Sequence, residues 1–591
     1  MREGSVLILA VGGNITQYIS SKESSIQKLE PASKELIQEL IVGKDRSSTS
    51  LMLFENNNSK GVKVRIQVER IYEHDNIEQQ DSSQVNPDLW TNLVKQIKQH
   101  ENNFEGIVVL HGLDTMSYTA AAVCFMIRNL KIPIVFTGSQ RPLNFIRSDA
   151  LQNIYASISF AAAKCLGLQP IREVTIYLHD TLFRANRATM SSASSYRSFD
   201  SLNFPPLATI GENIDINDHL ITNEKNSSAT SYSFATDANI QIIDVFPGMS
   251  PRVIEGLIGD DLDLIYLDKL KAQARKIAMD NGEVYEETDA NLILSELSDF
   301  MQKNNRAQRF GQIKLTVDKR KVIQTLSKLN IESEKKKLKG VVLRTYGMGT
   351  APTHLNVLKA LQKLVNSDVI VMNVTQAHSS KVSFSSDPVS LRLLEHGVIS
   401  GLDMTAESAF AKMVVILSDH KNIEKGKLFC EEELQKNRSG EQSHSIINFH
   451  FEKGEITELS NENFAVNKLL YLEKGKGEKD IILQHGIGIR RDNIQLRLLG
   501  LQKTEKRGGV KVQLKLIRCD DDSQDISEGI TILEAEVSLK KSSSTKEEIG
   551  TVNKSYDISE HWDKLFSRNA TFYLLSDQGI KWTRISIVVY A

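Results

Sequence analysis

The sequence predicts an α/β protein in which a doubly wound parallel sheet is followed by a smaller α/β domain and then by an all-β, sandwich-like domain. Over residues 1–221, short apolar runs rich in β-branched residues alternate with longer helical patterns, as is typical of parallel strands covered by helices. The alternation continues over residues 239–420, whereas short strands follow one another with almost no helix over residues 421–591. Division into domains also agrees with a length of 591 residues, because single hydrophobic cores rarely grow beyond about 300 residues.

The elements of the first domain follow from its periodicity. Strands are expected at 5–11, 63–69, 105–110, 133–137 and 173–178, and helices at 88–100, 115–129 and 147–165. Ligands of such sheets bind at the carboxyl ends of the strands, so the polar and glycine clusters at those ends are candidate site segments. These clusters are Gly12-Gly13-Asn14, His111-Gly112-Leu113-Asp114 and Thr137-Gly138-Ser139-Gln140.

The remaining boundaries are marked by changes in composition. A stretch rich in Ser, Asn and Thr at 222–238 predicts a linker, and the charged segment 259–338 carries apolar residues at helical spacing, which predicts a helical insertion in the second domain. The all-β region alternates apolar and polar residues, which favours antiparallel, half-buried strands and a β-sandwich. Its strands are expected at 445–452, 465–472, 480–489, 493–500, 509–518, 530–539, 570–576 and 582–590.

Composition narrows the class of protein. A net charge of -2 argues against a nucleic-acid binder. No apolar stretch reaches the roughly 18 residues of a membrane span, and the apolar start runs into Gly12-Gly13 without a cleavage pattern, so a first strand is expected rather than a signal peptide. Four cysteines fit neither a disulfide framework nor a zinc motif. We therefore expect a cytoplasmic protein with no metal and no cofactor.

Several segments at the predicted strand ends resemble the L-asparaginase family, in particular its cytosolic type I members. In family order they are Val108 to Met116, Thr137 to Pro142, Arg184-Ala185-Asn186-Arg187, Phe246-Pro247-Gly248, Tyr346-Gly347-Met348-Gly349 and Gly397 to Thr405. The chain is identified as a divergent member of that family over residues 5–418, with the insertion and the carboxyl-terminal domain added. The resemblance implies the two α/β domains, and homodimers or tetramers with the active site near the subunit contact.

The resemblance also implies a Thr-based hydrolase, because amide hydrolysis needs a nucleophile, a proton acceptor and donors for the oxyanion. In the family, one Thr follows the first Gly-Gly, a second stands in a His-Gly-Thr-Asp-Thr segment, and a Lys assists. Those positions hold Asn14, Leu113 and Met190 here, and none of these side chains can act as a nucleophile or a base. Asp114 is retained, but no catalytic set is intact. Thr16 lies two residues from the lost nucleophile, too far along the chain to replace it.

The residues that would hold a ligand are a separate matter. Ser82, Ser83 and Asp114 match a degenerate substrate-binding set, and Asp114 is expected to bind a substrate ammonium group. The alternative is that these residues persist because they hydrogen-bond loops and strand ends. Thr375-Gln376 is followed by Ala377-His378 rather than by the Cys of the family's allosteric asparagine site, so that site is not expected.

Three hypotheses for function follow. The first is a catalytically inactive pseudoenzyme with a structural or scaffold role in a large intracellular assembly, bound to other proteins through 259–338 and 421–591. The second is an active L-asparagine amidohydrolase, converting asparagine to aspartate and ammonia through rearranged residues. The third is an amino-acid-binding sensor. We expect the first, with enzyme activity left open, and with neither nucleic acid nor membrane as a partner.

Overall fold

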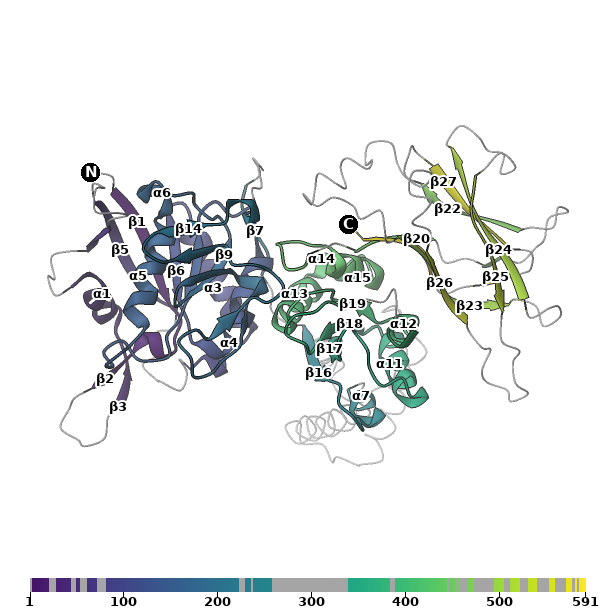
Figure 1. Cartoon of the computed structure of the whole chain (residues 1–591), viewed down its shortest axis with the longest axis horizontal. Coiled ribbons are helices and arrows are strands. Elements are labelled where there is room, and N and C mark those ends of the chain that lie inside the picture. The colour runs from purple at the N-terminus through teal and green to yellow at the C-terminus, as the bar shows by residue number, and fades with distance from the viewer. Residues whose placement is uncertain are drawn as a thin grey trace, which may run out of the picture.

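The computed structural model describes residues 3–20, 28–43, 49–53, 61–71, 81–222, 229–234, 238–257, 338–382 and 388–443, and further strands between residues 446 and 590. Figure 1 shows a layered α/β unit at the amino-terminal end, a smaller α/β unit beside it, and long strands at the carboxyl-terminal end. The predicted insertion lies outside the described residues up to residue 337, as does the strand expected at 480–489.

The largest sheet has nine strands. In chain order they are β1 (Glu3–Ala10), β4 (Ser50–Leu53), β5 (Val62–Arg70), β6 (Gly106–Leu110), β8 (Ile134–Thr137), β9 (Val174–Leu178), β10 (Thr181–Arg184), β13 (Ala208–Ile210) and β14 (Ile214–Ile216). Their order in the sheet is β14-β13-β10-β9-β8-β6-β1-β5-β4, and β9, β8, β6, β1 and β5 are parallel. The five predicted strands are therefore confirmed. The chain passes from β1 to β5 on one side and then to β6 on the other, which makes β1 the switch point where ligands of such sheets bind.

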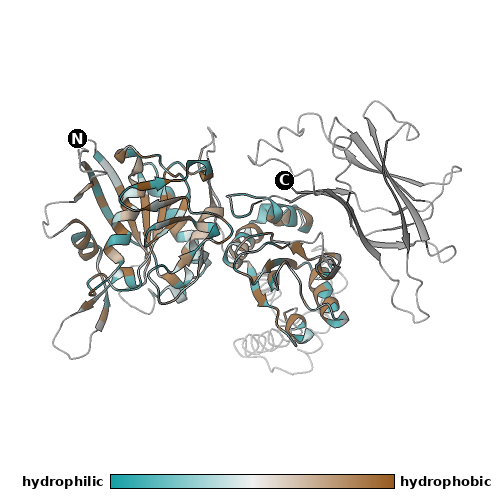
Figure 2. Ribbon diagram, viewed as in Figure 1, coloured by the Kyte–Doolittle hydropathy of each residue, from teal (hydrophilic) through white to brown (hydrophobic). Residues whose placement is uncertain are grey.

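Both faces of this sheet are covered. The helices are α1 (Lys34–Val42), α3 (Pro87–His100), α4 (Leu113–Met126), α5 (Ala150–Ala161) and α6 (Ala163–Leu166). Leu7 and Leu9 of β1 pack with α3 and α4, whereas Val6 and Ile8 pack on the other face with α1 and α5. A strand buried on both faces reads as a continuous apolar run, which is why the sequence located it well. Figure 2 shows hydrophobic colour along the central strands and hydrophilic colour on the outer surfaces.

The second sheet is parallel throughout, with the order β16 (Asn239–Asp244), β17 (Leu338–Thr345), β18 (Ile370–Thr375) and β19 (Ile399–Ser400). Helices α7 (Pro251–Glu255) and α11 (Leu355–Asn366) contribute to the core on one face, and α12 (Pro388–Glu395) precedes β19. Helix α13 (Ala406–Ser418) covers the other face and packs against α4 of the first unit. Ala120 of α4, Met413 of α13 and Val342 of β17 belong to one buried cluster, so the two units share a continuous core.

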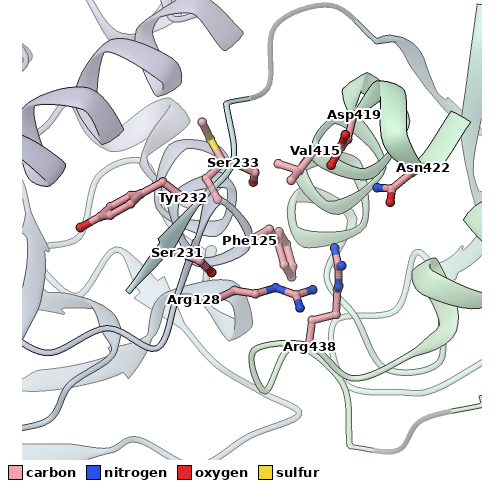
Figure 3. Close-up of a pocket in the computed structure, with 10 residues that line it drawn as sticks. Phe125, Arg128, Ser231, Tyr232, Ser233, Val415, Asp419, Asn422 and Arg438 are labelled. Carbon is pink, nitrogen blue, oxygen red and sulfur yellow. The ribbon is translucent and has the colours of Figure 1, made fainter. Parts of the chain in front are cut away.

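The chain between the two α/β units lies along the first of them where it is described. Strand β15 (Ser231–Tyr232), within the predicted linker, pairs with β7 (Ile127–Arg128) at the end of α4. A cavity of about 180 Å³ opens beside this pair, between the two units (Figure 3).

The predicted change to strands at residue 421 was placed too early. Helices α14 (His420–Glu424) and α15 (Lys427–Gln435) follow α13, and the first strand beyond them is β20 (Ile446–Phe451). The Asp419 side chain accepts a hydrogen bond from the Lys421 N–H and begins α14, and Gly426, at a φ of 93°, turns the chain into α15. Helices this short carry too few turns for an apolar period to stand out.

The carboxyl-terminal strands are antiparallel throughout. They are β20, β21 (Glu455–Ile456), β22 (Ala465–Tyr471), β23 (Ile494–Lys503), β24 (Lys511–Asp520), β25 (Ile530–Ser538), β26 (Val552–Asp557), β27 (Ala570–Ser576), β28 (Ile580–Lys581) and β29 (Arg584–Tyr590). One sheet has the order β20-β29-β23-β28-β21, with β26 on β23, and another has the order β22-β27-β24-β25. Every element among the described residues beyond 445 is a strand, as predicted, and the packing of these sheets as a sandwich stays a prediction. Within the described part of the chain, no helix has the length and apolar character needed to cross a membrane.

Candidate functional site

Three segments meet at the carboxyl edge of the large sheet, as the strand order requires. A Cβ atom on Gly13 would lie 2.3 Å from the Gly112 Cα, and a Cβ atom on Gly112 would lie 2.6 Å from the Ser82 Oγ. Because no side chain fits at either glycine, the chain after β1, the chain after β6 and the segment at Ser82 are in direct contact. A Cβ atom on Gly138 would lie 2.7 Å from the His111 carbonyl oxygen, so the segment after β8 joins them, and the three strand-end clusters selected from the sequence lie together.

Asn14 occupies the position where the family resemblance implies a nucleophile. It begins the short 3-10 helix η1 (Asn14–Thr16), and its exposed side chain donates a hydrogen bond from Nδ2 to the Gln140 carbonyl over 3.0 Å. The Gln140 side chain in turn donates to the Ser195 carbonyl over 3.1 Å. The Asn14 carboxamide therefore ties the segment after β1 to the segment after β8.

The Thr16 hydroxyl is not free to act as a nucleophile. The Thr16 side chain is buried, and its hydroxyl donates to the Gly13 carbonyl over 3.0 Å, within the same turn. The hydroxyl is consequently used in closing the turn that carries Asn14.

Leu113 is the first residue of α4 and is buried, with 8% of its surface exposed. Its Cδ2 atom lies 2.7 Å from the place that a Cβ atom on Gly138 would occupy, so it packs directly against the segment after β8. An apolar contact has replaced the hydroxyl that the resemblance implies at this position.

Asp114 and Met190 are the remaining two positions that the resemblance singles out. Asp114 is exposed in the first turn of α4, where the helix dipole favours a carboxylate. Met190 belongs to β11 (Thr189–Met190), which pairs with β12 (Phe199–Asp200), and it packs half-buried against the cluster that contains Leu113. Its thioether offers no proton for transfer.

Ser82 and Ser83 make contacts that hold the loops together. Ser82 is buried in the 3-10 helix η2 (Ser82–Gln84), and its carbonyl accepts a hydrogen bond of 2.7 Å from the Thr115 hydroxyl of α4. The Ser83 N–H donates to the Asp81 carboxylate over 2.8 Å. These bonds agree with the alternative that the serines persist for structural reasons.

His111 also lies at this edge, and the sequence did not indicate its burial or its protonation. It is fully buried beside Phe136, and its Nδ1 atom lies 2.8 Å from the Gly112 carbonyl oxygen. Burial lowers the pKa of His111 to about 4, although the contact with the Gly112 carbonyl opposes this shift. The imidazole is therefore neutral at physiological pH, and its Nε2 atom has no hydrogen-bond partner among the described residues.

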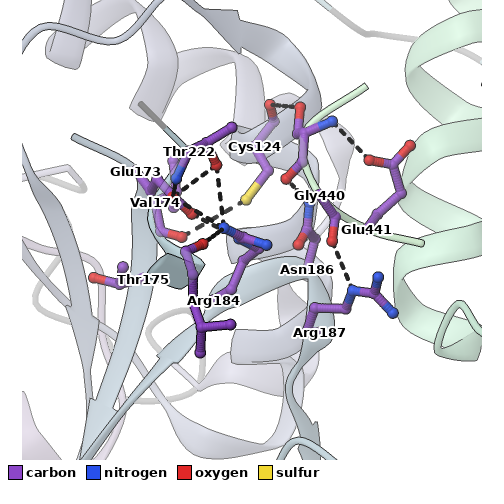
Figure 4. Close-up of polar contacts among 12 residues, drawn as sticks. Cys124, Glu173, Val174, Thr175, Arg184, Asn186, Arg187, Thr222, Gly440 and Glu441 are labelled. Atoms are coloured by element: carbon purple, nitrogen blue, oxygen red, sulfur yellow. Dashed lines mark hydrogen bonds and ion pairs between the residues drawn. The ribbon is translucent and has the colours of Figure 1, made fainter. Parts of the chain in front are cut away.

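A second group of polar residues, which the sequence did not reveal, lies between the two α/β units. Residues 436–443, here called the clasp, follow α15 and contact both units (Figure 4). The Ser439 hydroxyl donates to the Cys124 carbonyl over 3.1 Å, and the Arg187 Nε donates to the Gly440 carbonyl over 2.6 Å. Towards the second unit, Glu441 lies 2.6 Å from the Nζ of Lys412 on α13, and both side chains are fully buried.

Charge pairs surround the clasp. Burial alone would raise the pKa of Asp403, but Arg187, at 2.8 Å, and Ser443 hold it below the ordinary value. Burial likewise opposes ionisation of Glu173, and Arg184, at 2.6 Å, outweighs it and lowers the pKa. The arginines of the Arg184–Arg187 segment are thus structural anchors in this chain. Among the described residues, no group of three or more His, Cys, Asp or Glu side chains is arranged to hold a metal ion.

Comparison with known proteins agrees with this architecture. The family model for the amino-terminal domain of asparaginase matches residues 5–222, and the model for the glutaminase/asparaginase carboxyl-terminal domain matches residues 239–428. L-asparaginase 1 of Escherichia coli is 27% identical over 344 residues, covering 58% of this chain and 78% of that protein. A subunit of the glutamyl-tRNA(Gln) amidotransferase of Methanosphaera stadtmanae is 30% identical over 277 residues, covering 45% of this chain and 56% of that protein.

Among solved structures, L-asparaginase I from Vibrio cholerae superimposes with a TM-score of 0.51 at 25% identity, covering 75% of this chain and 100% of that chain. The two family models together take in the two α/β units, in the order in which the chain builds them. The matched residues include the large sheet with its switch point at β1, the smaller parallel sheet and the strand-end segments. The chain belongs to the asparaginase family.

Proposed function

We propose that this chain is a catalytically inactive member of the asparaginase family, a pseudoenzyme with a structural role in a larger assembly. The observation that supports this most is the state of the three positions at which the resemblance implies reactive groups. Asn14 ties two loops together, Leu113 fills a contact against Gly138, and Met190 packs on the same cluster. Each has a structural role that a catalytic side chain would not fill in the same way.

The neighbouring hydroxyls and the histidine support the same conclusion. Thr16 donates to the Gly13 carbonyl and Thr115 donates to the Ser82 carbonyl, so both protons are engaged. His111 is neutral and buried, and its Nδ1 contacts a backbone carbonyl rather than a hydroxyl. Since loss of one essential member of a catalytic set costs several orders of magnitude in rate, three losses without a replacement favour an inactive protein.

The scaffold role is proposed from surfaces and from the relatives. Phe246 and Met348 follow β16 and β17 at one edge of the smaller sheet, and half of each side chain is exposed. We propose that these two side chains, which follow neighbouring parallel strands, belong to the homodimer contact that the family resemblance implies. One relative is, by its name, a subunit of an amidotransferase, which supports a place for this fold in assemblies. Residues 259–338 and 421–591 are the proposed surfaces for other proteins.

The test is ammonia release from L-asparagine by the full-length protein at high enzyme concentration. We expect no release above the buffer control. Hydrolysis above that control, abolished by Asp114→Ala, would overturn the proposal in favour of the amidohydrolase alternative. The triple variant Asn14→Thr, Leu113→Thr and Met190→Lys restores the residues that the resemblance implies. Asparagine hydrolysis by this variant would show that the scaffold is intact and that these three positions alone account for the inactivity.

The sensor alternative has one specific observation in its favour, since the Asp114 carboxylate is exposed at the edge where ligands of such sheets bind. Titration calorimetry with asparagine, aspartate and glutamate addresses it. Saturable heat that disappears in Asp114→Asn would support a sensor, whereas no heat with any of the three amino acids would exclude it.

A further inference from the structure

The cavity between the two α/β units lies apart from the strand-end site. Its volume is about 180 Å³, and none of the residues that line it belongs to the family's reactive positions. The walls come from the end of α4 and β7, from β15, from α13 and α14, and from the clasp. The polar lining consists of Arg128, Ser231, Ser233, Asp419, Asn422 and Arg438.

Two guanidinium groups enter this cavity from different units. Arg128 belongs to β7 and Arg438 to the clasp, and Figure 3 shows their side chains extending towards one another. Burial lowers the pKa of Arg438, and the nearby charge of Arg128 lowers it further. Two like charges that face one small space repel each other unless an anion lies between them.

The acidic side chains nearby are already engaged. The Glu433 carboxylate is shared, with Oε1 2.6 Å from the Lys436 Nζ and Oε2 2.9 Å from an Arg438 terminal nitrogen. Asp419 lines the cavity, but one of its oxygens accepts the Lys421 N–H over 3.0 Å and begins α14. Burial opposes ionisation of Glu433, but the charges of Lys436, Arg438 and Arg128 all lower its pKa, so Glu433 acts on both arginines. Two carboxylates, Glu433 and Asp419, therefore face three cationic side chains, and one positive charge remains without a partner.

Donor capacity remains on both arginines. Within the described part of the chain, the exposed side chain of Arg128 forms no hydrogen bond and no ion pair, although its charge lowers the pKa of Glu433. The buried Nε of Arg438 has no hydrogen-bond partner there. A buried donor without an acceptor costs about 1–3 kcal/mol, so such a group in a folded protein requires an explanation.

We propose that this cavity binds a small phosphate-bearing anion, held between Arg128 and Arg438. The guanidinium fork matches the oxygens of a tetrahedral oxyanion, and two forks from different directions suit a dianion. A cavity of about 150 Å³ accommodates a molecule the size of benzene, so the space suffices for phosphate with a small ester group. The Ser231 and Ser233 side chains stand among the lining residues as further donors. Since the walls belong to both units, the anion would also join them.

The experiment is isothermal titration of the full-length protein with inorganic phosphate in a low-chloride buffer. We expect saturable binding with a Kd of about 1 mM or tighter. Arg128→Gln is expected to weaken it about tenfold or more, because charge-assisted hydrogen bonds are lost. Arg438→Gln should do the same, but it also breaks the pair with Glu433. Arg128→Gln, whose thermal unfolding without phosphate should match that of the parent protein, is therefore the deciding variant.

Arg197→Gln is the matched control, because this arginine is 62% exposed and lies 3.7 Å from its partner Asp200. It should bind phosphate like the parent protein. The proposal is overturned if the parent protein shows no binding, if Arg128→Gln binds as tightly as the parent, or if Arg197→Gln loses as much affinity as Arg128→Gln. Because neither Arg128 nor Arg438 belongs to the strand-end site, these outcomes do not depend on the proposed loss of activity.

Discussion

At the strand ends, individual side chains make packing and hydrogen-bond contacts at the positions where the resemblance implies reactive groups. Asn14 was selected from the sequence as the position of a lost nucleophile, and the structure adds its partner, the Gln140 carbonyl. The sequence could not indicate that partner, because 126 positions separate the two residues. The burial of His111 was equally hidden, since a polar residue after a strand reads as a site residue until its surroundings are known.

Neutral, buried His111 predicts a pH dependence of stability. Its pKa in the folded protein is about 4, below the ordinary value of 6.5, so below pH 6.5 the unfolded chain binds a proton that the folded protein does not. The contribution of His111 is therefore complete above pH 6.5 and is lost as the pH falls towards 4. The free energy of unfolding should decrease by up to about 1.4 kcal/mol per pH unit in this window.

Urea unfolding of the parent protein and of His111→Gln, measured between pH 7 and pH 4.5, tests this dependence. The variant should show a shallower slope, whatever its absolute stability. The exposed residue His219 provides the control, and His219→Gln should keep the parent slope. If the free energy of unfolding changes equally with pH in all three proteins, the pKa of His111 is not lowered by folding.

At the scale of elements, the sequence predicted those helices and strands that are marked by a pattern of neighbouring residues. The strands buried on both faces were located to within about two residues, because a continuous apolar run marks them. Helices α14 and α15 were missed, because they are short and rich in charged residues. The clasp was missed for a different reason, since its contacts join residues as distant as Ser439 and Cys124, which are 315 positions apart.

Gly440 gives a direct test of how tightly the clasp is seated. It has a φ of 78°, and a Cβ atom there would lie 2.6 Å from a terminal nitrogen of Arg184. Gly440→Ala should therefore combine backbone strain with a clash against an anchored guanidinium. Gly426→Ala provides a matched control, because Gly426 has a φ of 93° and no atom within 4 Å of an added Cβ.

We expect Gly426→Ala to lower the free energy of unfolding by about 1 kcal/mol, from strain alone. Gly440→Ala should lower it by a further 1 kcal/mol or more, roughly the cost of overpacking. Denaturant titrations monitored by circular dichroism give both values. If Gly440→Ala is no less stable than Gly426→Ala, the clasp or Arg184 can move enough to accept the added methyl group, and the clasp is not tightly packed.

At the scale of the whole molecule, the two α/β units are joined through α4, α13 and the clasp. At the centre of this junction, Lys412 and Glu441 are fully buried, and the Lys412 Nζ also donates to the Lys436 carbonyl over 2.5 Å. Burial alone would raise the pKa of Glu441, but Lys412 and the N–H groups of Arg438 and Ser439 keep it below its ordinary value. Nothing in the local sequence distinguishes Lys412 from a surface lysine of a helix, because its partner lies beyond two further helices.

Removing one member of this pair should destabilise both units together. Lys412→Met leaves a buried carboxylate without its partner and is expected to cost about 3–5 kcal/mol. The double variant Lys412→Met with Glu441→Gln should recover part of this loss, because no unpaired charge remains. Differential scanning calorimetry tests both expectations, and an early transition confined to one unit in Lys412→Met would contradict the fused arrangement.

The clasp ends at residue 443, and the first carboxyl-terminal strand, β20, begins at residue 446. A pull on the carboxyl-terminal strands along the chain is therefore transmitted to a segment anchored by Arg187, Asp403, Lys412 and the Cys124 carbonyl. A force that a bound partner exerts on these strands would be shared between both α/β units rather than concentrated in one. In mechanical terms, the clasp is the point at which the carboxyl-terminal strands are attached to the junction of the two α/β units.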